Sequence, residues 1–189
     1  GTHLALATVR RHGERIERAV LFGAEGPDDT LKLPSSADAL LAQLAPLAAR
    51  DGFQDLVGSA GRVIAALEQQ PATGRSLIHQ GRQVTLGAFD AQLAVAAALG
   101  RRSSQQMLPL ALRDAEQGNH DLLAALVLSV REGLQAMSAM PLAMDAASGA
   151  SPQRRALVSM QAGRSLLGEG LVFPLPTLSD DLGLVHLGE

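Results

Sequence analysis

The five histidines come first, because histidine is the commonest general base and a frequent zinc ligand. They fall at a helix start, a helix end, a hairpin, the beginning of another helix and the tail: His3, His12, His79, His120 and His186. No two stand three or four residues apart, so the spacing of a helical metal site is absent. Cysteine is also absent, which excludes thiolate catalysis, disulfides and cysteine-bound zinc. We predict no metal, no cofactor and no complete Ser-His-acid triad in this sequence.

Composition narrows the class of protein further. Of the 189 residues, 47% are hydrophobic and 19% are charged, which favours a chain that buries a core over a disordered one. The net charge is -3, and four phenylalanines are the only aromatic residues, so nucleic acid is not an expected partner. No apolar run reaches the roughly 18 residues that a membrane span needs, so no membrane association is expected.

The spacing of apolar residues predicts a mainly α chain. Helices are expected over residues 2–12, 37–50, 53–70, 89–99, 103–117, 119–137 and 152–167. Ser35 or Ser36 is the expected N-cap of the second helix, and Ser103 or Ser104 that of the fifth. Residues 140–151, which are mostly small, are predicted to form a break between helices.

Two kinds of strand are also predicted. A single small β-hairpin is expected from Ser76–His79 and Gln83–Leu86, around a turn at Gln80-Gly81-Arg82. Arg18–Gly23 has the continuous apolar character of a core-type strand in a parallel sheet. No second strand of this kind follows it. We therefore expect this unpaired strand to pair across a homo-dimer or to be covered by helices.

Three stretches of the sequence resemble serine α/β-hydrolases of the tripeptidyl-aminopeptidase and proline-iminopeptidase-like family. Gly1-Thr2-His3-Leu4-Ala5-Leu6-Ala7 is similar to the end of a nucleophile elbow, in which G-x-S-x-G is followed by Thr and a helix. Arg18–Gly23 with Glu25-Gly26-Pro27-Asp28 resembles the next core strand and the exit into an inserted helical cap. Residues 143–149 and 166–174 resemble the late segments of that cap.

The resemblance implies a fragment of an α/β-hydrolase fold with three parts. Residues 1–26 would be a remnant of the hydrolase core, 27–175 the helical cap or lid domain, and 176–189 a return segment towards the core. Gly1 would be the last glycine of the elbow, with Thr2 directly after it. The nucleophilic serine would then precede Gly1, and the acid and histidine of the triad would follow Glu189.

The resemblance also suggests where a substrate binds. Aminopeptidases of this kind hold the free α-ammonium of a peptide with acidic residues near the cap, and a carboxylate suits that charge. The candidates for substrate binding are Glu25, just past the predicted strand, and Asp145 and Met144 in the predicted break. The simpler interpretations are a solvated turn residue for Glu25, a local turn for Asp145 and core packing for Met144. Asp28 and Asp29 are interpreted as a solvated turn.

The expected function is thus that of a cap fragment, inactive by itself. Its parent would be a hydrolase that acts on peptide N-termini, with a peptide or a small ester or amide as substrate. The alternative is a non-catalytic helical binding module for a peptide or a small hydrophobic ligand. No signal peptide is visible and the true N-terminus is expected to be missing, so the sequence assigns no cellular compartment.

Overall fold

The computed structural model describes residues 2–26 and 28–173. In this part the chain forms eight α-helices and one two-stranded antiparallel hairpin, and helices make up 63% of it. The prediction of a mainly helical chain with a hairpin is confirmed. The chain divides into two compact units. Unit 1 takes residues 1–32 and 138–159, and unit 2 takes 33–137 and 160–173.

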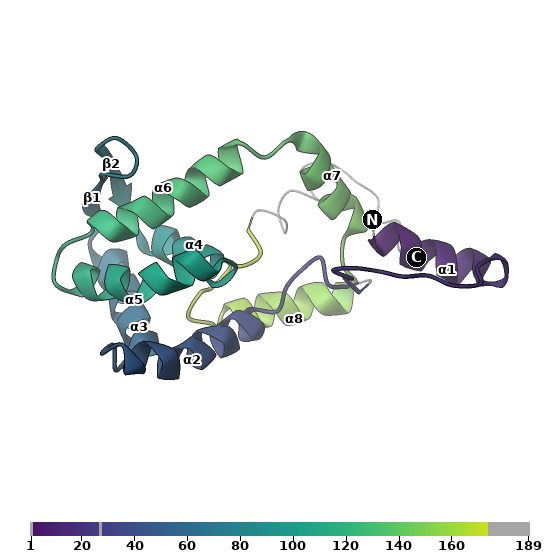
Figure 1. Ribbon diagram of the computed structural model, residues 1–189, viewed down its shortest axis with the longest axis horizontal. Coiled ribbons are helices and arrows are strands. Elements are labelled where there is room, and N and C mark those ends of the chain that lie inside the picture. The colour runs from purple at the N-terminus through teal and green to yellow at the C-terminus, as the bar shows by residue number, and fades with distance from the viewer. Residues whose placement is uncertain (1, 27, 174–189) are drawn as a thin grey trace. The chain divides into compact units, whose positions relative to one another are not determined.

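Unit 2 contains five of the helices and the hairpin (Figure 1). They are α2 (Pro34–Arg50), α3 (Leu56–Gln69), β1 (Ala72–Ser76), β2 (Arg82–Leu86), α4 (Ala88–Leu99), α5 (Arg102–Glu116) and α6 (Asp121–Gln135). Residues 123–128 of α6 are all buried, which places this helix at the centre of the core. Leu108 and Leu112 of α5 are also fully buried, as is Val95 of α4. Buried alanines of α4 at 91, 94 and 98 present little bulk to the neighbouring helices.

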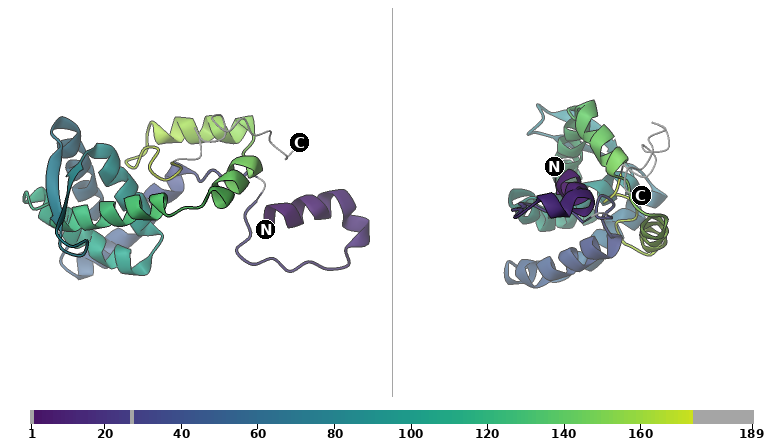
Figure 2. Two further views of the ribbon diagram at one scale, coloured as in Figure 1. Left: turned by 90° about the horizontal axis from the view of Figure 1, so that it is seen from above. Right: turned by 90° about the vertical axis from the view of Figure 1, so that its right-hand side faces the viewer.

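The hairpin lies against α6 (Figures 1 and 2). Gly74 is paired with Val84 across the hairpin. A β-carbon placed on Gly74 would lie 2.7 Å from the Ala124 β-carbon and also collide with the His120 carbonyl oxygen. Glycine at this position therefore permits the strand to approach α6 closely.

Unit 1 contains α1 (Thr2–His12), the 3-10 helix η1 (Gly13–Arg15), α7 (Ala139–Ser148) and the greater part of α8 (Pro152–Ala162). No residue of α1 is buried, and Leu4 is 74% exposed. The segment that follows η1 is equally open, since Val20 is 78% and Phe22 88% exposed. The apolar side chains of α1 and of residues 16–24 thus lack a core within the described residues.

The predicted strand at Arg18–Gly23 does not form. Residues 18–21 have no regular structure and residues 22–23 make a bend, with Gly23 at φ +59°. A strand needs backbone hydrogen bonds to a neighbour, and the described residues offer none to this segment. The prediction of a strand here is wrong for this chain alone.

The hairpin is displaced from its predicted position. The first strand runs over Ala72–Ser76 and not over Ser76–His79, so Leu77 and Ile78 belong to the turn, where they are 79% and 70% exposed. The apolar pair Leu77-Ile78 suggested a strand. Strand β1 lies earlier in the sequence than predicted because Gly74 permits close contact with α6. A pattern of apolar residues does not indicate such a contact.

The predicted break at residues 140–151 is also wrong in its greater part. Residues up to Ser148 form helix α7, since alanine and methionine favour helix, and only residues 149–151 separate it from α8. Helix α8 starts at Pro152 as predicted, but it ends at Ala162, five residues early.

The predicted serine N-caps lie inside their helices. Leu33 precedes α2, which has Pro34 at its first position, and Arg101 precedes α5. Proline has no backbone N–H to satisfy, which explains why α2 starts before the serines.

The described residues contain no single helix long and apolar enough to cross a membrane. The successive helices α6 and α7 pass this criterion only when they are taken together, by length and composition. The predicted division into 1–26, 27–175 and 176–189 stays a prediction, and residues 176–189 lie outside the described residues.

We predict opposite effects for two glycine substitutions. Gly74→Ala is expected to lower the free energy of unfolding by about 1–3 kcal/mol, because the new methyl group overlaps α6. Gly133→Ala, on the exposed face of α6 with open space around it, is expected to raise it by about 0.5–1 kcal/mol. Urea unfolding followed by circular dichroism measures both, and equal midpoints for the two variants would contradict the packing described here.

Candidate functional site

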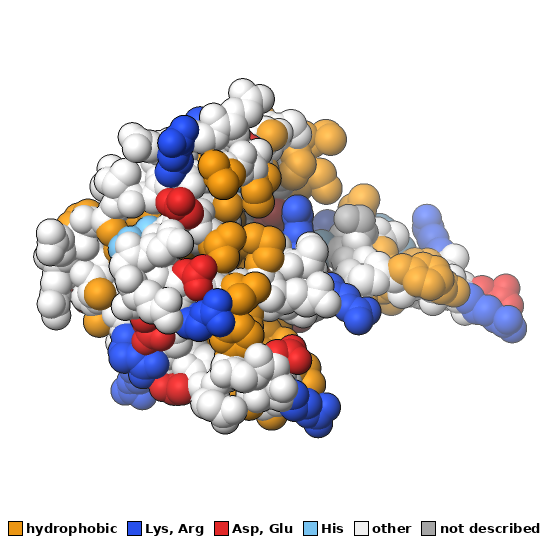
Figure 3. All heavy atoms as spheres, turned by 60° about the vertical axis from the view of Figure 1, so that its left-hand side comes forward, with side chains coloured by type: hydrophobic (Ala, Val, Ile, Leu, Met, Phe, Trp, Pro, Cys, Tyr) orange, Lys and Arg blue, Asp and Glu red, His pale blue; other side chains and the backbone are white. Residues whose placement is uncertain are grey.

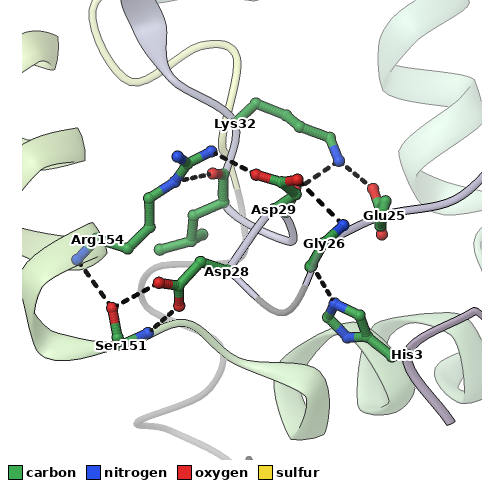
Figure 4. Close-up of polar contacts among 9 residues, drawn as sticks. His3, Glu25, Gly26, Asp28, Asp29, Lys32, Ser151 and Arg154 are labelled. Carbon is green, nitrogen blue, oxygen red and sulfur yellow. Dashed lines mark hydrogen bonds and ion pairs between the residues drawn. The ribbon is translucent and has the colours of Figure 1, made fainter. Parts of the chain in front are cut away.

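A group of polar residues in unit 1 lies where the chain leaves this unit, at residues 24–26 and 28–32 (Figure 4). We call this segment the exit turn. The Gly26 N–H donates to Asp29 Oδ2 at 3.0 Å, and the Asp29 N–H donates to the Gly26 carbonyl at 3.0 Å. The Lys32 ammonium forms an ion pair with Glu25 Oε1 and donates to the Asp29 carbonyl at 2.6 Å. The exit turn is therefore an ordered turn in which Asp29 organises the backbone.

The start of α1 is bound to the same turn. The Glu25 N–H donates to Thr2 Oγ1 at 3.3 Å. His3 Nε2 lies 2.6 Å from the Gly26 carbonyl oxygen and must be the donor, because a carbonyl only accepts. The structure thus brings two of the predicted site residues, Thr2 and Glu25, into contact. Gly1 lies outside the described residues.

The chain returns to unit 1 through α7 and α8, and this return is tied to the exit turn. Asp28 accepts two hydrogen bonds from Ser151, from its N–H at 2.6 Å and from its hydroxyl at 2.8 Å. Ser151 Oγ in turn accepts from the Arg154 N–H at 3.2 Å, as an N-cap of α8 does. Arg154 also donates to the Leu31 carbonyl at 2.9 Å and to Asp29 at 3.2 Å.

Sequence reasoning missed this tie. It interpreted Asp28 and Asp29 as a solvated turn, whereas both carboxylates bind residues more than 120 positions away. The sequence indicated only the start of helix α8, because serine directly before proline, as at Ser151-Pro152, is typical of a helix N-terminus.

Asp145 and Met144 lie within α7. Met144 is 52% exposed and Met140, one turn earlier on the same face, is 69% exposed. Asp145 is half-buried, and its side chain makes no hydrogen bond or ion pair within the described residues. No contact joins Asp145 to Glu25 there, so the two predicted carboxylates do not form one site in this part of the chain.

A second cluster, in unit 2, has the residue types of a catalytic triad. The hydroxyl of Ser76 lies 2.8 Å from His79 Nδ1, and His79 Nε2 lies 3.4 Å from both Ser129 Oγ and Glu132 Oε2. The two positive φ angles at Gln80 and Gly81 turn the hairpin so that His79 faces α6. The sequence offered no hint of this group, because its members come from a hairpin and a distant helix.

The hydrogen bonds of this cluster show that it joins the hairpin to α6 and is not suited to catalysis. Ser129 donates its proton to the Ala125 carbonyl at 2.9 Å, so it accepts from His79 Nε2. Ser76 donates to Nδ1, but it is fully buried, so no substrate reaches its oxygen. Neither serine combines an accessible oxygen with a free path for its proton to the imidazole.

A third group consists of charged residues on α3 and α5. Arg62 pairs with Asp55 at 2.8 Å and with Glu116, which also accepts from the Ser59 hydroxyl at 2.8 Å. Asp55 caps α3 by accepting from the Gly58 N–H. Basic and acidic side chains are likewise interspersed across the face drawn in Figure 3. The pairs of Arg62 connect α5 to α3 and its N-cap. The face drawn in Figure 3 shows no large patch of a single charge sign.

The pKa values of this group shift because of its mutual pairing. The hydrogen bond from Arg62 is the main reason that the pKa of Asp55 lies below its ordinary value of 3.8, and the Gly58 N–H adds to it. Arg62, followed by Ser59, likewise lowers the pKa of Glu116 from 4.5. The pKa of Arg62 is raised, chiefly by Glu116.

No family model, curated protein or solved structure matches the chain. Among residues 2–26 and 28–173 no three histidine or acidic side chains are grouped to hold a metal ion. His186 lies outside that range. The hydrolase family, the site roles and the partners therefore stay predictions and are taken up below as a proposal.

We predict that Arg62 stabilises the fold in a pH-dependent way. Carboxylates with lowered pKa values contribute stability that is present above their ordinary values, 3.8 and 4.5, and is lost as pH falls through the folded-state values. Arg62→Met should therefore lower the urea midpoint modestly at about pH 7, and this loss should shrink at about pH 3. Arg50→Met removes the same charge from a residue that forms no ion pair with the described part of the chain, and it serves as the control. A loss of equal size at both pH values would refute the pairing.

Proposed function

We propose that this chain supplies the helical cap and a part of the core of a serine α/β-hydrolase that removes residues from peptide N-termini. In this proposal the nucleophilic serine precedes Gly1, and the acid and histidine follow Glu189. The serine attacks the carbonyl carbon of the scissile bond, and an acyl-enzyme forms and is then hydrolysed. Glu25 holds the α-ammonium of the peptide through charge and hydrogen bonding. In this proposal the 189-residue chain by itself binds a peptide but does not hydrolyse it.

The tie between the exit turn and α8 is the observation that carries this proposal. Residues 33–137 leave unit 1 after Lys32 and return at Ser138, and Asp28 and Asp29 bind Ser151 and Arg154 on the return side. The larger segment of unit 2, residues 33–137, is thus inserted between two segments of unit 1 that these hydrogen bonds join, and residues 160–173 enter unit 2 a second time. The insertion of residues 33–137 is what a cap inserted into a hydrolase core requires.

The position of Glu25 also supports the proposal. Its N–H donates to the side chain of Thr2, which is the first residue of helix α1 and, in this proposal, the third residue after the nucleophilic serine. An aminopeptidase needs its ammonium-binding carboxylate close to the nucleophile, because only a few atoms separate the α-amine from the first peptide bond. The backbone of Glu25 is held at the first turn of α1, which in this proposal follows the nucleophile, so its carboxylate belongs to a residue close to that turn.

The open segment at residues 18–23 fits the same proposal. In a hydrolase core this segment would be a strand with neighbours on both sides, which would cover Val20 and Phe22 and satisfy the backbone. Within the described residues both side chains are exposed and the backbone is unpaired. A homo-dimer formed through this segment is the other way to pair its backbone groups and to cover its apolar side chains.

One observation favours a second candidate, a non-catalytic binding module. Met140 and Met144 expose a flexible apolar surface on one face of α7. Methionine adapts its shape to varied hydrophobic ligands. A peptide or small hydrophobe on this face needs no catalytic residues.

The coding sequence immediately before Gly1 distinguishes the two candidates. The hydrolase proposal expects a G-x-S-x pattern there, which with Gly1 completes the elbow. A different sequence at these positions refutes the hydrolase proposal and leaves the binding module.

We further predict that the 189-residue chain does not react with a fluorophosphonate probe and does not hydrolyse aminoacyl or acetyl chromogenic substrates. Removal of any triad member typically costs several orders of magnitude in rate, and the proposal places all three outside this chain. An active serine hydrolase under the same conditions is the positive control. Stoichiometric labelling of a serine such as Ser129, lost in Ser129→Ala, would show that the chain has a site of its own.

A further inference from the structure

The ammonium group of Lys32 is held by two acceptors in the exit turn. It pairs with Glu25 Oε1 and donates to the Asp29 carbonyl at 2.6 Å (Figure 4). A carboxylate combined with a backbone carbonyl is an arrangement that suits any primary ammonium, since such a group has three N–H donors. Lys32 thus places a primary ammonium on the carboxylate that the proposed function assigns to the substrate.

We propose that Lys32 is a tethered competitor that occupies the ammonium site of Glu25 when no substrate is bound. This inference rests on the proposed function, because that function assigns Glu25 to the α-ammonium of a peptide. A substrate with a free N-terminus then binds by displacing the Lys32 ammonium, while an N-blocked peptide has no group that can replace it. Lys32 therefore weakens the binding of every ligand that uses Glu25.

The backbone that carries the two acceptors is held by contacts that do not involve Lys32. The backbone of Asp29 is held by its hydrogen bonds with Gly26, and the Asp29 carboxylate is bound by Arg154, whose side chain is only 17% exposed. The Glu25 backbone is held by Thr2. None of these contacts involves Lys32, so in this proposal its displacement leaves the two acceptors available to another ammonium.

Lys32 is also displaceable. Its side chain is 45% exposed and that of Glu25 is 43% exposed, so water competes for both charges. Exposed ion pairs of this kind contribute at most about 1 kcal/mol, which corresponds to about a fivefold change in affinity. The expected effect of Lys32 is therefore a two- to fivefold weakening of ligand binding.

The experiment measures binding of trialanine amide, which has a free N-terminus, to the isotope-labelled 189-residue chain by NMR titration. N-acetyl-trialanine amide is the control ligand. The variants are Lys32→Met, which removes the charge at similar length, Lys32→Arg, which retains it, and Glu25→Gln. Arg11→Met, on α1, controls for the loss of one positive charge elsewhere in unit 1. Circular dichroism checks that each variant is folded.

The proposal expects Lys32→Met to bind trialanine amide two- to fivefold more tightly than the unmodified chain, with no such gain in Lys32→Arg or Arg11→Met. It also expects Glu25→Gln to abolish the gain and the acetylated peptide to show none. Equal affinity of Lys32→Met and the unmodified chain, with binding still lost in Glu25→Gln, would overturn the role of Lys32 and leave the role of Glu25 intact. Binding that is absent, or unaffected by Glu25→Gln, would overturn both roles. The hydrolase proposal itself is decided separately, by the sequence before Gly1.

Discussion

The carboxylate of Asp28 accepts two hydrogen bonds from Ser151, and the arrangement of unit 1 depends on this contact. It joins segments separated by 123 residues, one where the chain leaves the unit and one where it returns. Ser151 caps α8, so the same carboxylate also helps to define where that helix begins. The contact therefore joins the two segments of unit 1 that flank residues 33–137 in the sequence, and the exit turn with Glu25 and Lys32 belongs to the first of them.

Unit 2 follows a different constraint, which is the burial of α6. Six consecutive residues of this helix are buried, so it needs apolar neighbours on every side. Helices α4 and α5 provide part of this cover, and the hairpin completes it at Gly74, where no side chain intervenes. His79 and Glu132 then connect the hairpin turn to the same helix at its polar end. This cluster contains the residue types of a catalytic triad. Hydrogen bonds that join two elements use the same serine, histidine and acidic side chains as catalytic proton transfer does.

The two units differ in how far local patterns predicted them. Helix α4 was predicted to within one residue at its start, because an alanine-rich sequence favours helix in any setting. Strand β1 was predicted four residues too late, because its position depends on the contact of Gly74 with α6 and not on apolar residues of its own. Arg18–Gly23 has the composition of a core strand, but composition does not supply a neighbour, and this segment remains unpaired within the described residues.

The sequence by itself determined the helical class, the presence of a two-stranded hairpin and the absence of cysteine chemistry. These follow from periodicity, composition and short motifs, which act over a few residues. Only the tertiary structure decided that Asp28 binds Ser151, that Lys32 occupies Glu25 and that Asp145 lies apart within α7. The physical reason is that a side chain chooses its partner by proximity in space, and the fold brings residues together over distances along the chain that no local pattern records.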